Sequence, residues 1–226
     1  MKYHSILQFI NTMICCNIKY NYNNYFKNAK SKGLSPEGDA YRMRSFGIQP
    51  GCYMPQTVSI CPLAATGVEA IARVKGGPLA PGISGIVCFR NVPGGTVVCA
   101  NIDGLPAYQP AKDGQQPIGP HGFHIHEFGN CGVGNPDDPF TAAGGHWNPA
   151  NQPHGNHAGD FPVLFSNNGR AIMCFFTDKF KPADVVGKSV IIHQNPDDYR
   201  TQPAGNAGKR LACGVIEAFP RAVPYI

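Results

Sequence analysis

The sequence predicts an all-β protein built as an antiparallel sandwich or barrel, and three observations support this. Glycine (27) and proline (21) together exceed a fifth of the 226 residues, and charged residues are only 15%. Short runs rich in β-branched and aromatic residues recur along the chain and are separated by turn residues. No segment has the apolar spacing of a convincing amphipathic helix.

The expected strands start near Gly67, and two pairs of them form hairpins. Pro93, Gly94 and Gly95 make one turn, and Asn167, Asn168 and Gly169 make an Asn-Gly turn in the other. The expected strands are VEAIARV (68–74), GISGIVCFRNV (82–92), TVVCANIDGL (96–105), HGFHIHEF (121–128), FPVLFS (161–166), RAIMCFF (170–176), SVIIH (189–193) and LACGVIEAF (211–219).

The chain divides into three parts by composition. Residues 1–63 are expected to be an N-terminal extension and linker, either disordered or a targeting segment. Residues 64–219 are expected to form the β domain, and 220–226 a C-terminal tail. The apolar stretch 6–18 is too short and too polar to span a membrane. It follows a basic Lys2 but precedes no small-residue cleavage site. The location is therefore undetermined; export or the cell envelope is preferred, and the cytoplasm is the alternative.

Charge and cysteine usage exclude some functions. The formal charge of +5 comes without a basic stripe interleaved with aromatics, so no nucleic-acid partner is expected. Nine cysteines include no C-x-x-C pair, which argues against a zinc ribbon or a thioredoxin-type motif. Cys88 and Cys99 are symmetric about the Pro93-Gly94 turn. They are expected to lie opposite each other and face outward, with Phe89 and Val98 facing the core; whether the two are bonded is left open.

The histidines carry the chemistry, since seven of the eight lie between residues 121 and 193. Residues two apart in a strand share a face, so His124 and His126 point the same way, and Phe123 and Ile125 point to the core. Neutral imidazoles suit copper and zinc. His121 has the core-side parity and is interpreted as a structural, hydrogen-bonded histidine.

A second cluster follows in the long Gly/Pro/Asn-rich region. His146, His154, His157 and Asp160 lie within fifteen residues and could form a tetrahedral zinc site with three nitrogens and one oxygen. His193 ends an apolar strand. The two clusters together predict a metal centre.

Several segments resemble the signature segments of copper/zinc superoxide dismutases, over about residues 66–218. They are GFHIHEFGNC, AGGHWNP, HAGD, the His193 segment and GNAGKRLACGVIE. The resemblance implies an eight-stranded Greek-key β-barrel with the metals outside its wall, under two long metal-binding loops. The position of Cys131 resembles the bacterial branch more than the animal cytosolic one. The stretch from Asp197 to Arg210 is also short, which implies a truncated form of the family's charged guidance loop.

The resemblance also implies a role for each matching residue. Copper would be bound by His124, His126, His146 and His193, and zinc by His146, His154, His157 and Asp160. Asp197 would link ligands of the two metals, Arg210 would receive the anion, and Cys131 and Cys213 would form a disulfide. The implied activity is dismutation of superoxide to dioxygen and hydrogen peroxide by alternating reduction and oxidation of copper, with His146 exchanging a proton, as antioxidant defence.

Two other functions are considered. A copper carrier on the same barrel would be expected to lack a copper ligand or the arginine, and neither is missing. A zinc hydrolase or structural zinc protein would be expected to have three protein ligands, an open water position and a nearby catalytic carboxylate, and the second histidine cluster is surplus to that design. The gap between His154 and His157 is shorter than in the animal enzymes, but we expect it to keep zinc, with Gly155 supplying a positive φ. A homodimer would be compatible with the family, although the sequence does not determine the oligomeric state.

Overall fold

The computed structural model describes residues 67–219, and these are almost entirely β-strand and loop. Helical structure in this range consists of α3 (Pro182–Val185) and the 3-10 turn η1 (Thr141–Ala143). No helix within 67–219 is long and apolar enough to cross a membrane. The expectation of an all-β domain is confirmed. The interpretations placed on the first sixty residues and on 220–226 lie outside the described range.

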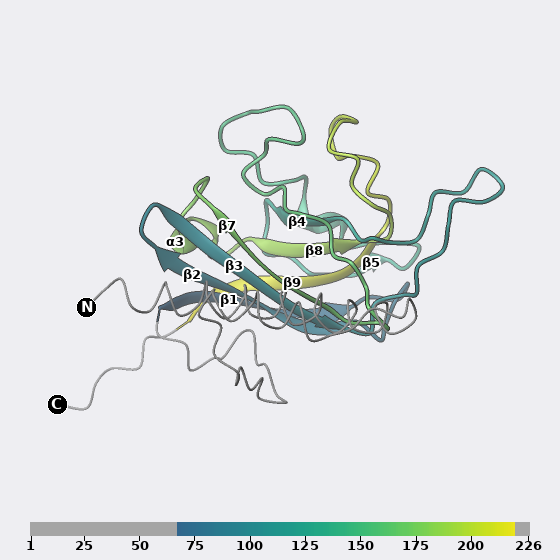
Figure 1. Cartoon of the computed structure of the whole chain (residues 1–226), viewed down its shortest axis with the longest axis horizontal. Coiled ribbons are helices and arrows are strands. Elements are labelled where there is room, and N and C mark those ends of the chain that lie inside the picture. Colours follow the sequence, from purple (N-terminus) through teal and green to yellow (C-terminus); the bar gives the residue numbers. More distant parts are fainter. Residues whose placement is uncertain (1–66, 220–226) are drawn as a thin grey trace, which may run out of the picture. The chain divides into compact units, whose positions relative to one another are not determined.

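One curled antiparallel sheet of seven strands forms the body of the domain (Figure 1). Its order is β4-β8-β9-β1-β2-β3-β7, and a separate small sheet pairs β5 with β6. The last strand, β9, pairs with β1 of the β1-β2-β3 meander, and β7 pairs with β3 at the other end of that meander. The bounds are β1 Val68–Gly76, β2 Ser84–Val92, β3 Gly95–Asp103, β4 Phe123–His126, β5 Gly134–Asn135, β6 Asp138–Pro139, β7 Ala171–Thr177, β8 Ser189–His193 and β9 Arg210–Ala218.

The β2–β3 hairpin has the predicted register. Val92 pairs with Gly95 across the turn, and Cys88 pairs with Cys99. Phe89 and Val98 are fully buried in the main core, so the two cysteines lie on the other face of the sheet, as expected. The alternation of core and outer residues follows from the two-residue period of a strand.

The prediction of a strand at 161–166 is wrong, because the segment forms a single isolated bridge, at Leu164. His121 pairs with Leu164, and two backbone hydrogen bonds join them, at 2.9 and 2.8 Å. Pro162 has no N–H to donate, and Val163 donates its N–H to the Tyr199 hydroxyl instead. The segment therefore flanks β4 without forming a continuous ladder. The Asn-Gly turn after it is present, with positive φ at Asn168 and Gly169.

Two disulfides join described residues. Cys131 is bonded to Cys213, which ties the long loop to β9. Cys99 is bonded to Cys174 on β7, its other cross-strand neighbour, so the bond to Cys88 that the sequence left open does not form. Cys88 is itself disulfide-bonded and is not a free thiol. A bridge that closes a loop of about 80 residues is worth about 4 kcal/mol of unfolding free energy in the chain-entropy model.

The core lies on one face of β4 and β8, and the histidines lie on the other. Phe123 and Ile125 are fully buried in the main cluster, as predicted, so the intervening His124 and the following His126 point away from it. The long loops 129–160 and 194–209 rise on this side of the sheet, above β4 and β8 (Figure 1). The fold thereby places two strands and two loops around the histidine side chains.

Candidate metal centre

Two groups of potential metal ligands lie side by side above β4 and β8, and they share His146. Within each group the ligand atoms all lie within 4.8 Å of one another. The first group is His124, His126, His146 and His193, and the second is His146, His154, His157 and Asp160. These are the two sets expected from the sequence. The structure brings all the residues of both sets together, although His124 and His193 of the first group lie almost seventy positions apart in the sequence.

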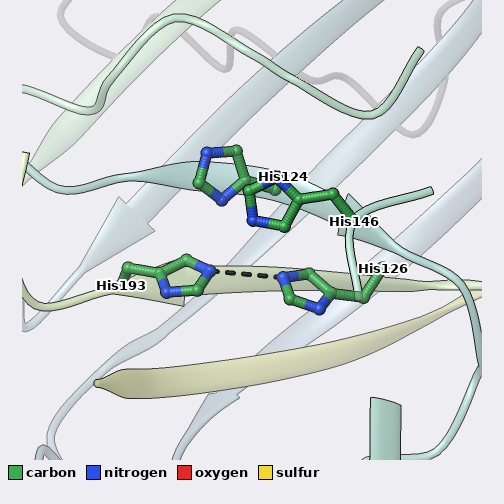
Figure 2. A group of neighbouring side chains, drawn as sticks. All are labelled: His124, His126, His146 and His193. Carbon is green, nitrogen blue, oxygen red and sulfur yellow. Dashed lines mark hydrogen bonds between the residues drawn. The ribbon is translucent and has the colours of Figure 1, made fainter. Parts of the chain in front are cut away.

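The tautomers of His126 and His193 follow from their backbone partners. His126 Nδ1 donates to the carbonyl oxygen of Gly144 at 2.9 Å, and His193 Nδ1 donates to that of Gly208 at 3.2 Å. Each Nδ1 therefore carries the hydrogen, and each Nε2 carries a lone pair. The two Nε2 atoms nevertheless face each other at 3.2 Å (Figure 2). Two acceptors at this distance repel unless a cation lies against both, so the geometry fits a metal ion.

His124 and His146 complete the first group from above. Their rings stack with centroids 3.9 Å apart (Figure 2). The buried atoms His124 Nδ1 and His146 Nε2 have no hydrogen-bond partner among the described residues. An orphaned buried nitrogen is costly, and a metal ion would satisfy it.

Three imidazoles converge on Asp160 in the second group. The Nδ1 atoms of His146, His154 and His157 lie 3.0, 3.3 and 3.2 Å from its carboxylate oxygens. His146 thus presents Nδ1 to this group, while its Nε2 is left for the first one. Asp160 also accepts backbone N–H groups of Gly155 and His157, which fixes the carboxylate within the turn. Gly155 has φ +90°, the positive value that the short turn was expected to need.

Asp197 connects the two groups through a buried carboxylate. Its Oδ2 accepts from His124 Nε2 at 2.6 Å, and its Oδ1 accepts from His154 Nε2 at 2.8 Å. Each ring is thereby oriented with Nδ1 toward its own ligand group. A carboxylate that holds the outer nitrogen of a metal-binding histidine fixes its tautomer and raises its basicity.

Arg210 lies at the start of β9, next to the first group. Its guanidinium donates to the carbonyl oxygens of Phe140 and Gly144, the latter at 2.7 Å. Gly144 also accepts from His126, so one carbonyl connects the arginine to that histidine. Partial burial lowers the pKa of Arg210 from its usual value, which lies far enough above neutrality that the side chain stays charged.

Burial favours the neutral form of His124, His126 and His193, which is the form that metals bind. It lowers the pKa of His193 to about 3, with His146 acting in the same direction. Burial and neighbouring imidazoles also hold the pKa values of His124 and His126 well below 6.5. Burial acts to raise the pKa of Asp160, but the hydrogen bond from His146 and the neighbouring imidazoles outweigh it and keep the pKa low. Neutral imidazole and ionised carboxylate are the ligand states.

Residues outside the two ligand groups also support the centre. One of them, His121, was predicted from the sequence, and the others were not. His121 is fully buried, bonds the His193 carbonyl through Nδ1 at 2.9 Å and belongs to neither group, as expected for a structural histidine. The carbonyls of Gly144 and Gly208 were missed, because a main-chain acceptor has no signature in the side-chain pattern. Gln202, which bonds the main chain of His154, was also missed, since a glutamine in a polar loop has no distinguishing signal.

Comparison with known proteins gives one consistent result. Residues 83–216 match the family described as "Copper/zinc superoxide dismutase (SODC)". A "Superoxide dismutase [Cu-Zn]" of Deinococcus radiodurans is 36% identical over 193 residues, covering 74% of this chain and all of the relative. One of Legionella pneumophila is 36% identical, over 59% of this chain and 77% of the relative. An "Extracellular superoxide dismutase [Cu-Zn]" of Rattus norvegicus is 32% identical, over 66% and 62%.

Proposed function

Because this chain belongs to the copper/zinc superoxide dismutase family, we propose that it converts superoxide to dioxygen and hydrogen peroxide at the metal centre above β4 and β8. The observation that carries the proposal is the pair of ligand groups that share His146. We assign the activity to the domain 64–219.

The donor chemistry supports a different ion for each group. His124, His126, His146 and His193 offer four neutral nitrogens, a set that suits copper. The second group offers three nitrogens and one carboxylate, which suits a closed structural zinc site. When bound, copper would supply the one-electron redox chemistry, and zinc would hold the loop.

The residues of this chain have separate tasks in the reaction. Arg210 attracts and orients the superoxide anion, because its planar, permanently charged donor group is fixed by two carbonyls beside His126. His146 Nε2 would be a copper ligand in one state of the enzyme and would hold a proton in the other, while its Nδ1 stays with the second group. This proton and a second one from water convert the reduced oxygen species to hydrogen peroxide. Asp197 keeps His124 and His154 in the orientation that both groups require.

We also propose a location and an oligomeric state for the protein. Disulfides persist in oxidising compartments, and two are present within residues 67–219. One relative is named extracellular. We therefore favour export to the cell exterior or envelope, where the enzyme would act in antioxidant defence. A homodimer is a further proposal, which sedimentation of the purified chain would test.

The primary test uses the purified protein loaded with both metals. We expect one copper and one zinc per chain by elemental analysis, together with rapid catalytic consumption of superoxide. Removal of copper alone should abolish the activity and readdition should restore it. Full metal loading without superoxide consumption would contradict the proposed function and favour a copper-carrying role.

Replacement of Arg210 by Ala should slow turnover on the order of tenfold and flatten its dependence on ionic strength. The reason is that attraction between an anion and a fixed charge is screened within about 8 Å at physiological salt. Turnover measured at several salt concentrations and at matched metal content tests this. Arg200→Ala is the control, since it removes an equal charge from an exposed position of the loop that precedes β9 and should have a much smaller effect. An Arg210→Ala enzyme with the parental rate and salt response would show that the residue is only a surface charge.

A further inference from the structure

One side chain of the 194–209 loop, that of Gln202, forms hydrogen bonds with the main chain of His154. The His154 N–H donates to Gln202 Oε1 at 2.8 Å, and Gln202 Nε2 donates to the His154 carbonyl oxygen at 3.3 Å. Gln202 Nε2 also donates to the Arg200 carbonyl oxygen at 3.2 Å. Within the described residues, both hydrogen bonds of the His154 main chain therefore go to this one amide.

The ring of His154 is held from the same loop at its far end. Asp197 Oδ1 accepts from Nε2, and Asp197 is steadied by the Tyr199 N–H, which donates to the same oxygen at 2.7 Å. The imidazole is fully buried, and its Nδ1 lies 3.3 Å from Asp160 Oδ2. Holding both the main chain and Nε2 leaves a single way for Nδ1 to point, which is into the second ligand group.

The two loops also fit tightly around this residue. A Cβ at Gly155 would come within 2.4 Å of the Tyr199 carbonyl oxygen, and the Tyr199 hydroxyl bonds both Val163 N and Phe161 O on the other side of the turn. Only two residues separate His154 from His157. The turn has no room to compensate for a shift of the His154 main chain. Such a shift would therefore move His154 Nδ1, the ligand atom.

We propose that Gln202 is a positioning residue for the zinc ligand His154, and that it couples the 194–209 loop to zinc binding. This inference rests on the proposed function, because it takes the second ligand group as a zinc site. Gln202 is itself exposed, so its contribution falls at the lower end of the tenfold to hundredfold range of residues that orient metal ligands. The hydrogen-bonding capacity of the amide, and not its volume, carries the effect.

The test measures metal affinity directly, without turnover. Cobalt(II), whose visible absorption reports the geometry of a tetrahedral site, is titrated against a chelator into the full chain with copper already bound. We expect about tenfold weaker cobalt binding and an altered spectrum in Gln202→Ala and in the similarly shaped Gln202→Met. Gln202→Glu keeps the acceptor for the His154 N–H and should lie between these and wild type. Gln152→Ala is the matched control, since Gln152 lies in the other loop and, among residues 67–219, its side chain forms hydrogen bonds with Ala150 and Asn156 alone.

The outcomes separate this inference from the proposed function. Wild-type affinity and spectrum in Gln202→Ala, or an equal loss in Gln152→Ala, would overturn the positioning role while leaving the zinc site intact. A metal-free Gln202→Ala protein that has lost as much unfolding free energy as the metal-bound one would show a purely structural role and overturn it as well. Failure of wild type to bind cobalt or zinc would overturn the zinc site and this inference together.

Discussion

The His124→Ala variant is expected to lose superoxide dismutation altogether and to bind copper weakly, while its sheet still folds. His124 projects from β4 on the face opposite Phe123 and Ile125, so its loss leaves the main apolar core complete. The same substitution removes a ligand nitrogen and leaves Oδ2 of the buried Asp197 without its partner. Copper content, activity per folded chain and the free energy of unfolding of the metal-free protein are the three measurements.

His121→Ala provides the comparison, since His121 is equally buried and lies only three residues away. It belongs to neither ligand group, and its Nδ1 bonds the carbonyl oxygen of His193. We expect this variant to lose about 1–3 kcal/mol of unfolding free energy, because the carbonyl loses a buried partner. It should keep one copper per chain. Retained activity in His124→Ala at matched copper content would refute the ligand assignment.

The second large effect is expected at the zinc site. His157→Ala removes one of the four zinc ligands, so the affinity for zinc should fall roughly a hundredfold or more. This loss exceeds the tenfold to hundredfold fall that is typical when a residue that only orients a metal ligand is replaced. Without zinc, the three histidine Nδ1 atoms around Asp160 have no cation to hold them, and the 147–160 segment should be cleaved faster by protease. Elemental analysis at saturating metal and the rate of limited proteolysis measure both consequences.

Asn156→Ala is a suitable control for this experiment, because Asn156 is exposed and adjoins His157, and the one hydrogen bond of its side chain to a described residue goes to the Gln152 side chain. It should keep zinc and resist protease as wild type does. If wild type takes up no zinc, or if His157→Ala loses none, the short turn between His154 and His157 does not form the site.

Most of the strands and the face on which the histidines lie are determined by local sequence. The two-residue period of a strand is enough to place His124 and His126 on one face and Ile125 on the other, and the symmetry of a tight turn is enough to place Cys88 opposite Cys99. These features depend on neighbours within a few residues. The grouping of His146 and His193 with the β4 histidines did not follow from local sequence, and it was expected only because the segments resemble those of a known family.

The tertiary structure decided what depends on which segments become neighbours. Cys99 bonds Cys174 and not Cys88 because β7 lies beside β3, a pairing between residues 75 positions apart. Segment 161–166 forms no full strand because Pro162 lacks a donor and the Tyr199 hydroxyl takes the N–H of Val163. Gln202 bonds the main chain of His154, 48 positions away, because the fold brings their two loops together. A sequence pattern specifies the direction in which a side chain points, whereas its partner is set by the order of the strands and by the loops that this order brings together.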